Sequence, residues 1–215
     1  MKTVFIVLIS IGIVMSARAQ QHISIGPTVG FGHGWLYAEN PTAGYERVFH
    51  PAYNAGMKVV YSIVNHWGIS ADLKFSGEGG RYNSAQANSE YIYRANYIRL
   101  PLQGIYFFGE YGQAVRPKIS LGPSFGFLAG GKVKQEVNEQ TSTEKDISTL
   151  FKGFDLGLNF AAGANFRVSP NTWLNTDLTY YHGLSDVSET SNTIRNRNIG
   201  INVGLLIGID GPKLK

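Results

Sequence analysis

Residues 154–168 read FDLGLNFAAGANFRV, and the apolar side chains in this stretch fall on every second position. One face carries Phe154, Leu156, Leu158, Phe160, Ala162, Ala164, Phe166 and Val168. The other carries Asp155, Gly157, Asn159, Ala161, Gly163, Asn165 and Arg167. Successive side chains of a β-strand point to opposite faces, so the stretch predicts a strand with one apolar face and one small or polar face. It is much longer than a usual globular strand, which favours a lipid-facing wall.

The same alternation recurs along the chain. Residues 198–209 repeat it, with Ile199, Ile201 and Val203 opposite Asn198, Gly200 and Asn202. In all, eight segments alternate in this way: 23–32, 53–63, 69–76, 97–108, 118–127, 154–168, 174–181 and 198–209. The pattern predicts an all-β fold, an eight-stranded antiparallel up-and-down transmembrane β-barrel.

The connections between these segments alternate in length. Short ones lie at 65–68, 110–116 and 169–171, and long polar ones at 36–52, 77–94, 131–152 and 185–196. Outer-membrane barrels have short periplasmic turns and long outer loops. We therefore expect every short connection to lie in the periplasm and every long one outside.

The first residues predict export. Lys2 precedes an apolar stretch from Val4 to Val14, and Ala17-Arg18-Ala19 matches a signal-peptide cleavage site. We expect a signal peptide over residues 1–19 and a barrel domain over residues 20–215. The apolar stretch is shorter than a spanning helix requires.

Composition excludes several classes of protein. The chain has no cysteine, so it offers neither disulfides nor thiolate metal ligands. Its formal net charge is only +4, and Lys2 and Arg18 lie within the predicted signal peptide. Without a basic stripe, no nucleic acid partner is expected.

The small or polar faces of the predicted strands hold charges of both signs. Because an unpaired buried charge is costly, we expect these side chains to pair inside a narrow lumen that they fill. The predicted lumen network consists of Lys58, Asp72, Lys74, Arg99, Gln103, Lys118, Asp155, Asn159, Arg167, Asp177 and Asn202.

Aromatic residues gather at the strand ends beside the short connections. Amphipathic rings favour the boundary between membrane and water. We therefore predict a periplasmic aromatic girdle of Trp67, Tyr106, Phe108, Phe166 and Trp173.

Four stretches resemble a known family. Residues 97–102, YIRLPL, are similar to a strand of the PorT-like outer-membrane β-barrel family of Bacteroidota, with its tyrosine, alternating apolar residues and proline. Residues 117–126, PKISLGPSFG, resemble that family's glycine-rich strand, and residues 180–184 and 198–204 resemble its last two strands. The resemblance implies an eight-stranded barrel and, for PorT itself, a part in type IX protein secretion.

No catalytic constellation emerges from the sequence, and no cofactor or metal site is predicted. His182 and Ser185 invite comparison with lipid-modifying outer-membrane enzymes, but alternation places them on opposite faces. Two alternatives stay open. One is such an enzyme. The other is a soluble exported β-barrel that binds an apolar ligand, with its apolar residues inside and its polar residues outside.

The expected setting is the outer membrane. There the chain would contact outer-membrane lipid, be inserted by the barrel-assembly machinery, and act as a monomer. The charged stretch 132–152 could extend the wall as a ribbon and bind a protein partner. The predicted role is therefore structural or loop-mediated, without enzymatic activity.

Overall fold

The computed structural model describes residues 22–40, 43–84, 88–137 and 140–209. The predicted signal peptide, residues 1–19, lies outside them. Within them the strands are β1 (His22–Ala38), β2 (Glu46–Val48), β3 (Pro51–Ser62), β4 (Trp67–Ser84), β5 (Ser89–Phe107), β6 (Val115–Val137), β7 (Gln140–Asp146), β8 (Phe154–Ser169), β9 (Thr172–Gly183) and β10 (Ile194–Gly208). One short 3₁₀ helix, η1, spans Ile147–Thr149. No helix of the described ranges is long and apolar enough to cross a membrane.

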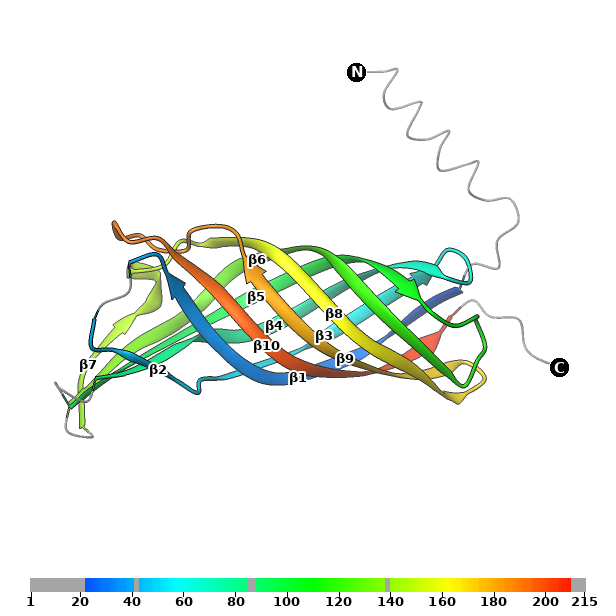
Figure 1. Ribbon diagram of the computed structural model, residues 1–215, viewed down its shortest axis with the longest axis horizontal. Helices are drawn as coiled ribbons and strands as arrows, with labels where there is room; N and C mark the ends of the chain where they lie inside the picture. The colour runs from blue at the N-terminus through cyan, green and yellow to red at the C-terminus, as the bar shows by residue number, and fades with distance from the viewer. Residues whose placement is uncertain (1–21, 41–42, 85–87, 138–139, 210–215) are drawn as a thin grey trace, which may run out of the picture.

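Eight of these strands close into a ring. In order around the ring they are β1, β3, β4, β5, β6, β8, β9 and β10, and β10 pairs with β1 again; every pairing is antiparallel. Figure 1 shows them winding steeply around the long axis of a barrel. The predicted eight-stranded antiparallel barrel is confirmed.

The two ends of the barrel differ. At the short-turn end, β3 leads into β4, β5 into β6 and β8 into β9 through short links, and the start of β1 and the end of β10 lie there (Figure 1). At the long-loop end lie β2, β7 and η1. The predicted sorting of connections by length therefore holds for three of the four long connections, whereas β4 and β5 are joined at the long-loop end by the short link between Ser84 and Ser89.

Side chains alternate across the wall as the sequence predicts. Outward-facing Leu73 and Ile201 are 59% and 60% exposed, whereas inward-facing Arg99 and Asp155 are 3% and 0% exposed. The apolar face is thus the outer face. An apolar exterior around a closed hydrogen-bond ladder suits lipid, which offers backbone amides no partner.

The wall continues beyond the barrel at the long-loop end. Here β4, β5 and β6 run on past residues 77, 96 and 130, β2 pairs with β4, and β7 pairs with β6. We call this five-stranded extension the outer sheet. The prediction that residues 77–94 form a long loop is wrong, because Gly77–Ser84 and Ser89–Asn96 pair as strands.

A β-bulge marks the point where the outer sheet leaves the barrel. The pairing of β5 with β6 shifts register between Asn96 and Tyr97. Opposite it, Gly130 and Gly131 have φ angles of 129° and 147°, a conformation that side-chain-bearing residues rarely adopt. Bulges are common at barrel rims, where they bend the strand.

Candidate functional site

The inner face of the barrel carries two networks of paired charges. The first centres on Arg99 of β5. Its Nε lies 2.5 Å from Oε1 of Glu78, and its Nη2 lies 2.6 Å from both Oε2 of Glu78 and Oδ2 of Asp155. The rings of Tyr181 and Tyr97 flank the guanidinium at 4.1 and 4.8 Å. A fully buried cation is thus matched by two carboxylates and two aromatic faces.

Further polar groups complete this network from other strands. Ser76 Oγ donates to Oε1 of Glu78 at 2.8 Å. Asp155 accepts from Ser185 Oγ at 2.9 Å and from Asn196 Nδ2 at 2.9 Å. The network therefore joins β4, β5, β8 and β10 and the segment after β9.

The second network lies nearer the short-turn end. Lys118 Nζ contacts Oδ1 of Asp177, and Lys58 Nζ lies 3.5 Å from Oδ2 of the same carboxylate and 3.7 Å from Oδ2 of Asp72. Asn175 Nδ2 donates to Asp177 at 2.8 Å. Four strands, β3, β4, β6 and β9, meet through this cluster.

Four other predicted lumen residues also lie inside. Gln103 Nε2 donates to Ser120 Oγ at 3.0 Å and to the carbonyl of Asn159 at 3.4 Å, and Asn202 Nδ2 donates to Thr179 Oγ1 at 2.8 Å. Lys74 is half-buried beside the first network. Within the described residues, no carboxylate lies within 4.0 Å of its ammonium group.

Arg167 is the exception among the predicted lumen residues. It is exposed, because it lies near the end of β8 beside a register shift, where the side chain reaches solvent at the short-turn end. Its assignment to the lumen network is wrong.

Apolar side chains fill the barrel at both ends. The short-turn plug consists of Val60, Ile105, Phe107, Trp173 and Leu206. Buried Arg116 lies over it, 3.9 Å from the ring centroid of Phe107, and donates to the carbonyl of Asn65 at 2.6 Å. The long-loop plug consists of Leu36, Ala95, Tyr97, Val133, Ile147, Phe151 and Val187. The polar networks are thus enclosed between two apolar layers.

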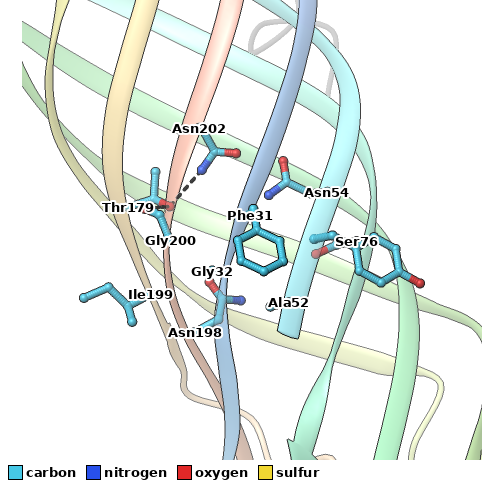
Figure 2. Close-up of a pocket in the computed structure, with 11 residues that line it drawn as sticks. Phe31, Gly32, Ala52, Asn54, Ser76, Thr179, Asn198, Ile199, Gly200 and Asn202 are labelled. Carbon is cyan, nitrogen blue, oxygen red and sulfur yellow. Dashed lines mark hydrogen bonds between the residues drawn. The ribbon is translucent and has the colours of Figure 1, made fainter. Parts of the chain in front are cut away.

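Small cavities lie between the plugs, among the described residues. Two cavities of about 20 Å³ lie beside the networks, and Asn54, Ser76, Thr179 and Asn202 line both. Figure 2 shows these side chains around the first cavity, with Asn202 bonded to Thr179. Such a volume holds about one water molecule. These cavities have no room for a larger solute.

Four of the five residues predicted to form the aromatic girdle lie on the outer face of the barrel, where the girdle stays a prediction. Trp67, Tyr106 and Phe108 form an outward cluster, with ring centroids 5.0 Å apart for Trp67 and Tyr106 and 5.2 Å apart for Tyr106 and Phe108. Phe166 is also exposed. Trp173 is 4% exposed and belongs to the short-turn plug, because its position in β9 shares the inward face of Asn175 and Asp177. Its assignment to the girdle is wrong.

Three residues of the first network lie outside the strand segments predicted from the sequence: Glu78, Ser185 and Asn196. Glu78 fell in the predicted loop 77–94, yet it continues the even-numbered inward face of Asp72, Lys74 and Ser76. Extending the alternation past Ser76 would have found it. The other two lie where a strand gives way to a loop, and no local pattern identifies them.

Histidine and serine do not form a catalytic pair here. Ser185 Oγ bonds to Asp155, while His182 Nδ1 contacts the guanidinium of Arg197 and lies 3.3 Å from the hydroxyl of Tyr180. Among the described residues there is also no cluster of three histidine or acidic side chains that could hold a metal ion.

Comparisons with known proteins identify the architecture. The model of a family described as outer membrane protein beta-barrel domain matches residues 15–189. The outer membrane protein OprG from Pseudomonas aeruginosa has a similar structure, with a TM-score of 0.54 at 11% identity, covering 92% of this chain and 99% of that one. For a major outer membrane protein from Thermus thermophilus, the TM-score is 0.53 at 12% identity, with coverages of 87% and 99%. No curated protein matches significantly.

At these identities the two structures support the fold alone. The family match, together with the apolar exterior, overturns the alternative of a soluble exported barrel with an apolar ligand. The lumen of this chain holds polar networks between two apolar plugs, and most apolar side chains of the wall strands face outward.

Proposed function

Because the chain belongs to the family of outer membrane protein beta-barrel domains and lies in the outer membrane, we propose that it is a non-enzymatic scaffold that presents its outer sheet to a protein partner. The short-turn end then faces the periplasm, and the long-loop end faces outward.

The outer sheet carries this proposal. It continues the barrel wall without a flexible linker, so it is held rigidly above the membrane. Among the described residues β7 pairs with β6 alone, which leaves its other edge open. An open strand edge offers backbone donors and acceptors that an extended segment of a partner can pair with.

The filled lumen supports a scaffold better than a pore. Salt bridges and apolar plugs occupy the interior, and the two cavities beside the networks each hold about one water. We propose that the charges serve to bind the strands to one another.

A more specific proposal is a part in protein secretion, as in PorT. Its support is the resemblance of residues 97–102 and of the later strands to that family. We also propose that the barrel-assembly machinery inserts the chain and that it acts as a monomer, since the closed ladder offers no strand edge within the wall.

The test uses cells in which the gene is deleted and then restored with variants. Glu144→Pro removes a backbone donor from the open edge of β7, because Thr143 and Lys145 direct their amides toward β6, whereas Glu144→Ala keeps it. We expect the proline variant to insert normally but to lose secretion of proteins to the cell surface, with the alanine variant restoring it. Full secretion from the proline variant would contradict binding at the β7 edge, and full secretion from the deletion strain would contradict the secretion role.

A further inference from the structure

A cluster of cations and aromatic rings lies on the outside of the barrel near the long-loop end. We call it the rim patch, formed by Trp35 and Tyr37 of β1, Arg47 of β2, Tyr180 and His182 of β9, and Arg197 of β10. Trp35 pairs with Arg197, and Arg197 pairs with His182, so the patch spans three neighbouring strands, and Arg47 of β2 joins it over the ring of Trp35.

The patch lies where the outer face changes character. One step toward the short-turn end, Ile199 pairs with both His33 and Tyr180, and the next outward residue, Ile201, is 60% exposed. Along β10 the outward residues below the patch are therefore aliphatic, whereas the patch itself is cationic and aromatic. This is the level at which lipid headgroups meet acyl chains.

Arg197 has aromatic and imidazole partners but no carboxylate. Its guanidinium lies 5.3 Å from the ring centroid of Tyr37, donates to the Tyr180 hydroxyl at 3.2 Å and contacts Nδ1 of His182. Its Nε is buried and has no hydrogen-bond acceptor. Within the described residues, no acidic side chain lies within 4.0 Å of it.

Arg47 is held in a similar way. Its guanidinium lies 5.5 Å from the ring centroid of Trp35, and no carboxylate of the described chain lies within 4.0 Å of it. Nearby Arg195 differs, because its Nη1 lies 2.7 Å from Oε1 of Glu39. The guanidinium groups of Arg47 and Arg197 thus lack an anionic partner among the described residues, whereas that of Arg195 is paired with Glu39.

We propose that the rim patch binds the phosphate of an outer-leaflet glycolipid, with Arg47 and Arg197 as its ligands. A cation beside a low-dielectric phase is costly without a counter-ion, and the planar guanidinium matches phosphate oxygens in two-point geometry. Basic sites at a membrane boundary bind phosphorylated headgroups in the same way. The acyl chains then lie along Ile199 and Ile201. This inference rests on the proposed orientation of the barrel.

The experiment measures lipid retained by the purified protein in native mass spectrometry. The probes are a diphosphorylated glucosamine-disaccharide lipid, its dephosphorylated form and inorganic phosphate. Wild-type protein is compared with Arg47→Gln/Arg197→Gln, and two controls remove arginines elsewhere: Glu39→Gln/Arg195→Gln beside the patch and Arg167→Gln at the other end. Cold-SDS gel mobility verifies that each variant is folded.

We expect wild-type protein to prefer the phosphorylated lipid, and the double variant to weaken its binding by about ten- to a hundredfold, the value of one or two charge-assisted hydrogen bonds. The controls should stay within about twofold of wild type. If wild-type protein binds the phosphorylated and the dephosphorylated lipid equally, the proposal is overturned, and this comparison needs no variant. Unchanged binding by the double variant also overturns it. Displacement of the lipid by an equal concentration of inorganic phosphate would assign the patch to free phosphate instead.

Discussion

Arg99 shows how strongly single residues of the lumen depend on one another. It is buried between Glu78 and Asp155, whose carboxylates come from different strands. Removing one partner of a buried ion pair costs about 3–5 kcal/mol, because the remaining charges stay buried without compensation. We therefore expect Arg99→Ala to lower the free energy of unfolding by about that amount, measured by urea unfolding of the protein in lipid vesicles.

The control for this prediction is Arg167→Ala, which removes an exposed arginine and should change the free energy of unfolding by less than about 0.5 kcal/mol. Neutralising the whole cluster with Arg99→Met/Glu78→Gln/Asp155→Asn should cost less than Arg99→Ala, because no lone charge remains. Equal stability of Arg99→Ala and wild type would show that the two carboxylates do not depend on Arg99.

Gly30 is a second residue at which packing inside the lumen limits the size of the side chain. A Cβ at this position would lie 2.1 Å from Oδ1 of Asn202 and 2.4 Å from Nδ2 of Asn54. Gly30→Leu should therefore destabilise the barrel by about 1–3 kcal/mol through overpacking, as measured by thermal loss of cold-SDS mobility. Its neighbour Val29 faces outward and is 59% exposed, so Val29→Leu should have no measurable effect. A stable Gly30→Leu variant would mean that the lumen is looser than these distances indicate.

At the scale of elements, alternation along the chain predicts the eight wall strands but not the outer sheet. A wall strand has lipid on one side and a packed lumen on the other, so each second residue must be apolar. In the proposed orientation most of the outer sheet stands above the membrane, and β7 reads QTSTEKD with no apolar face. The sequence therefore predicts a loop at 77–94, although Val133, Gln135 and Val137 did indicate a ribbon within 132–152.

The two wrong site residues have a related cause. Arg167 and Trp173 lie opposite each other at the short-turn end, on the inward face of β8 and β9. Residue type suggested a girdle position for Trp173, whereas its position in the alternation places it inside with Asn175. Near a strand end the inward face opens to solvent, so alternation alone does not decide whether a charge such as Arg167 is buried.

The ribbon of β6 and β7 yields a prediction about pH. Lys132 donates to Glu144, with Nζ 2.5 Å from Oε1, and this hydrogen bond lowers the pKa of the Glu144 carboxyl. A lowered folded-state pKa means that the stabilisation is present above the ordinary glutamate pKa of about 4.3 and is lost as the pH falls through the lowered value. Amides of the ribbon should then exchange faster with solvent below about pH 4 than at neutral pH, after correction for intrinsic rates.

The effect should be small, less than about fivefold, because the pair is exposed to solvent. Lys132→Gln/Lys134→Gln removes both cations near Glu144 and should reduce the pH dependence of exchange in the ribbon alone. If this variant and wild type show the same dependence, the ribbon is held by its backbone pairing without a contribution from these charges.

At the scale of the whole molecule, closure of the ring and filling of the lumen serve the same end. The ring leaves no unpaired strand edge in the lipid, and the two plugs with the charge networks between them replace water in the interior. Each plug takes side chains from several strands, so the interior also fixes the strands relative to one another. A barrel built in this way should be rigid and non-conducting.

Two tryptophans near the short-turn end distinguish a packed interior from a pore. Trp173 is buried in the short-turn plug, and Trp67 is 57% exposed on the outer face. Trp173→Ala should lower the free energy of unfolding by about 3–5 kcal/mol through the cavity it leaves, whereas Trp67→Ala should cost less. In planar bilayers wild type and both variants should conduct no ions, because the long-loop plug and both charge networks still close the lumen after Trp173 is lost. Steady conductance from Trp173→Ala, with little loss of stability, would instead show that Trp173 gates an open path.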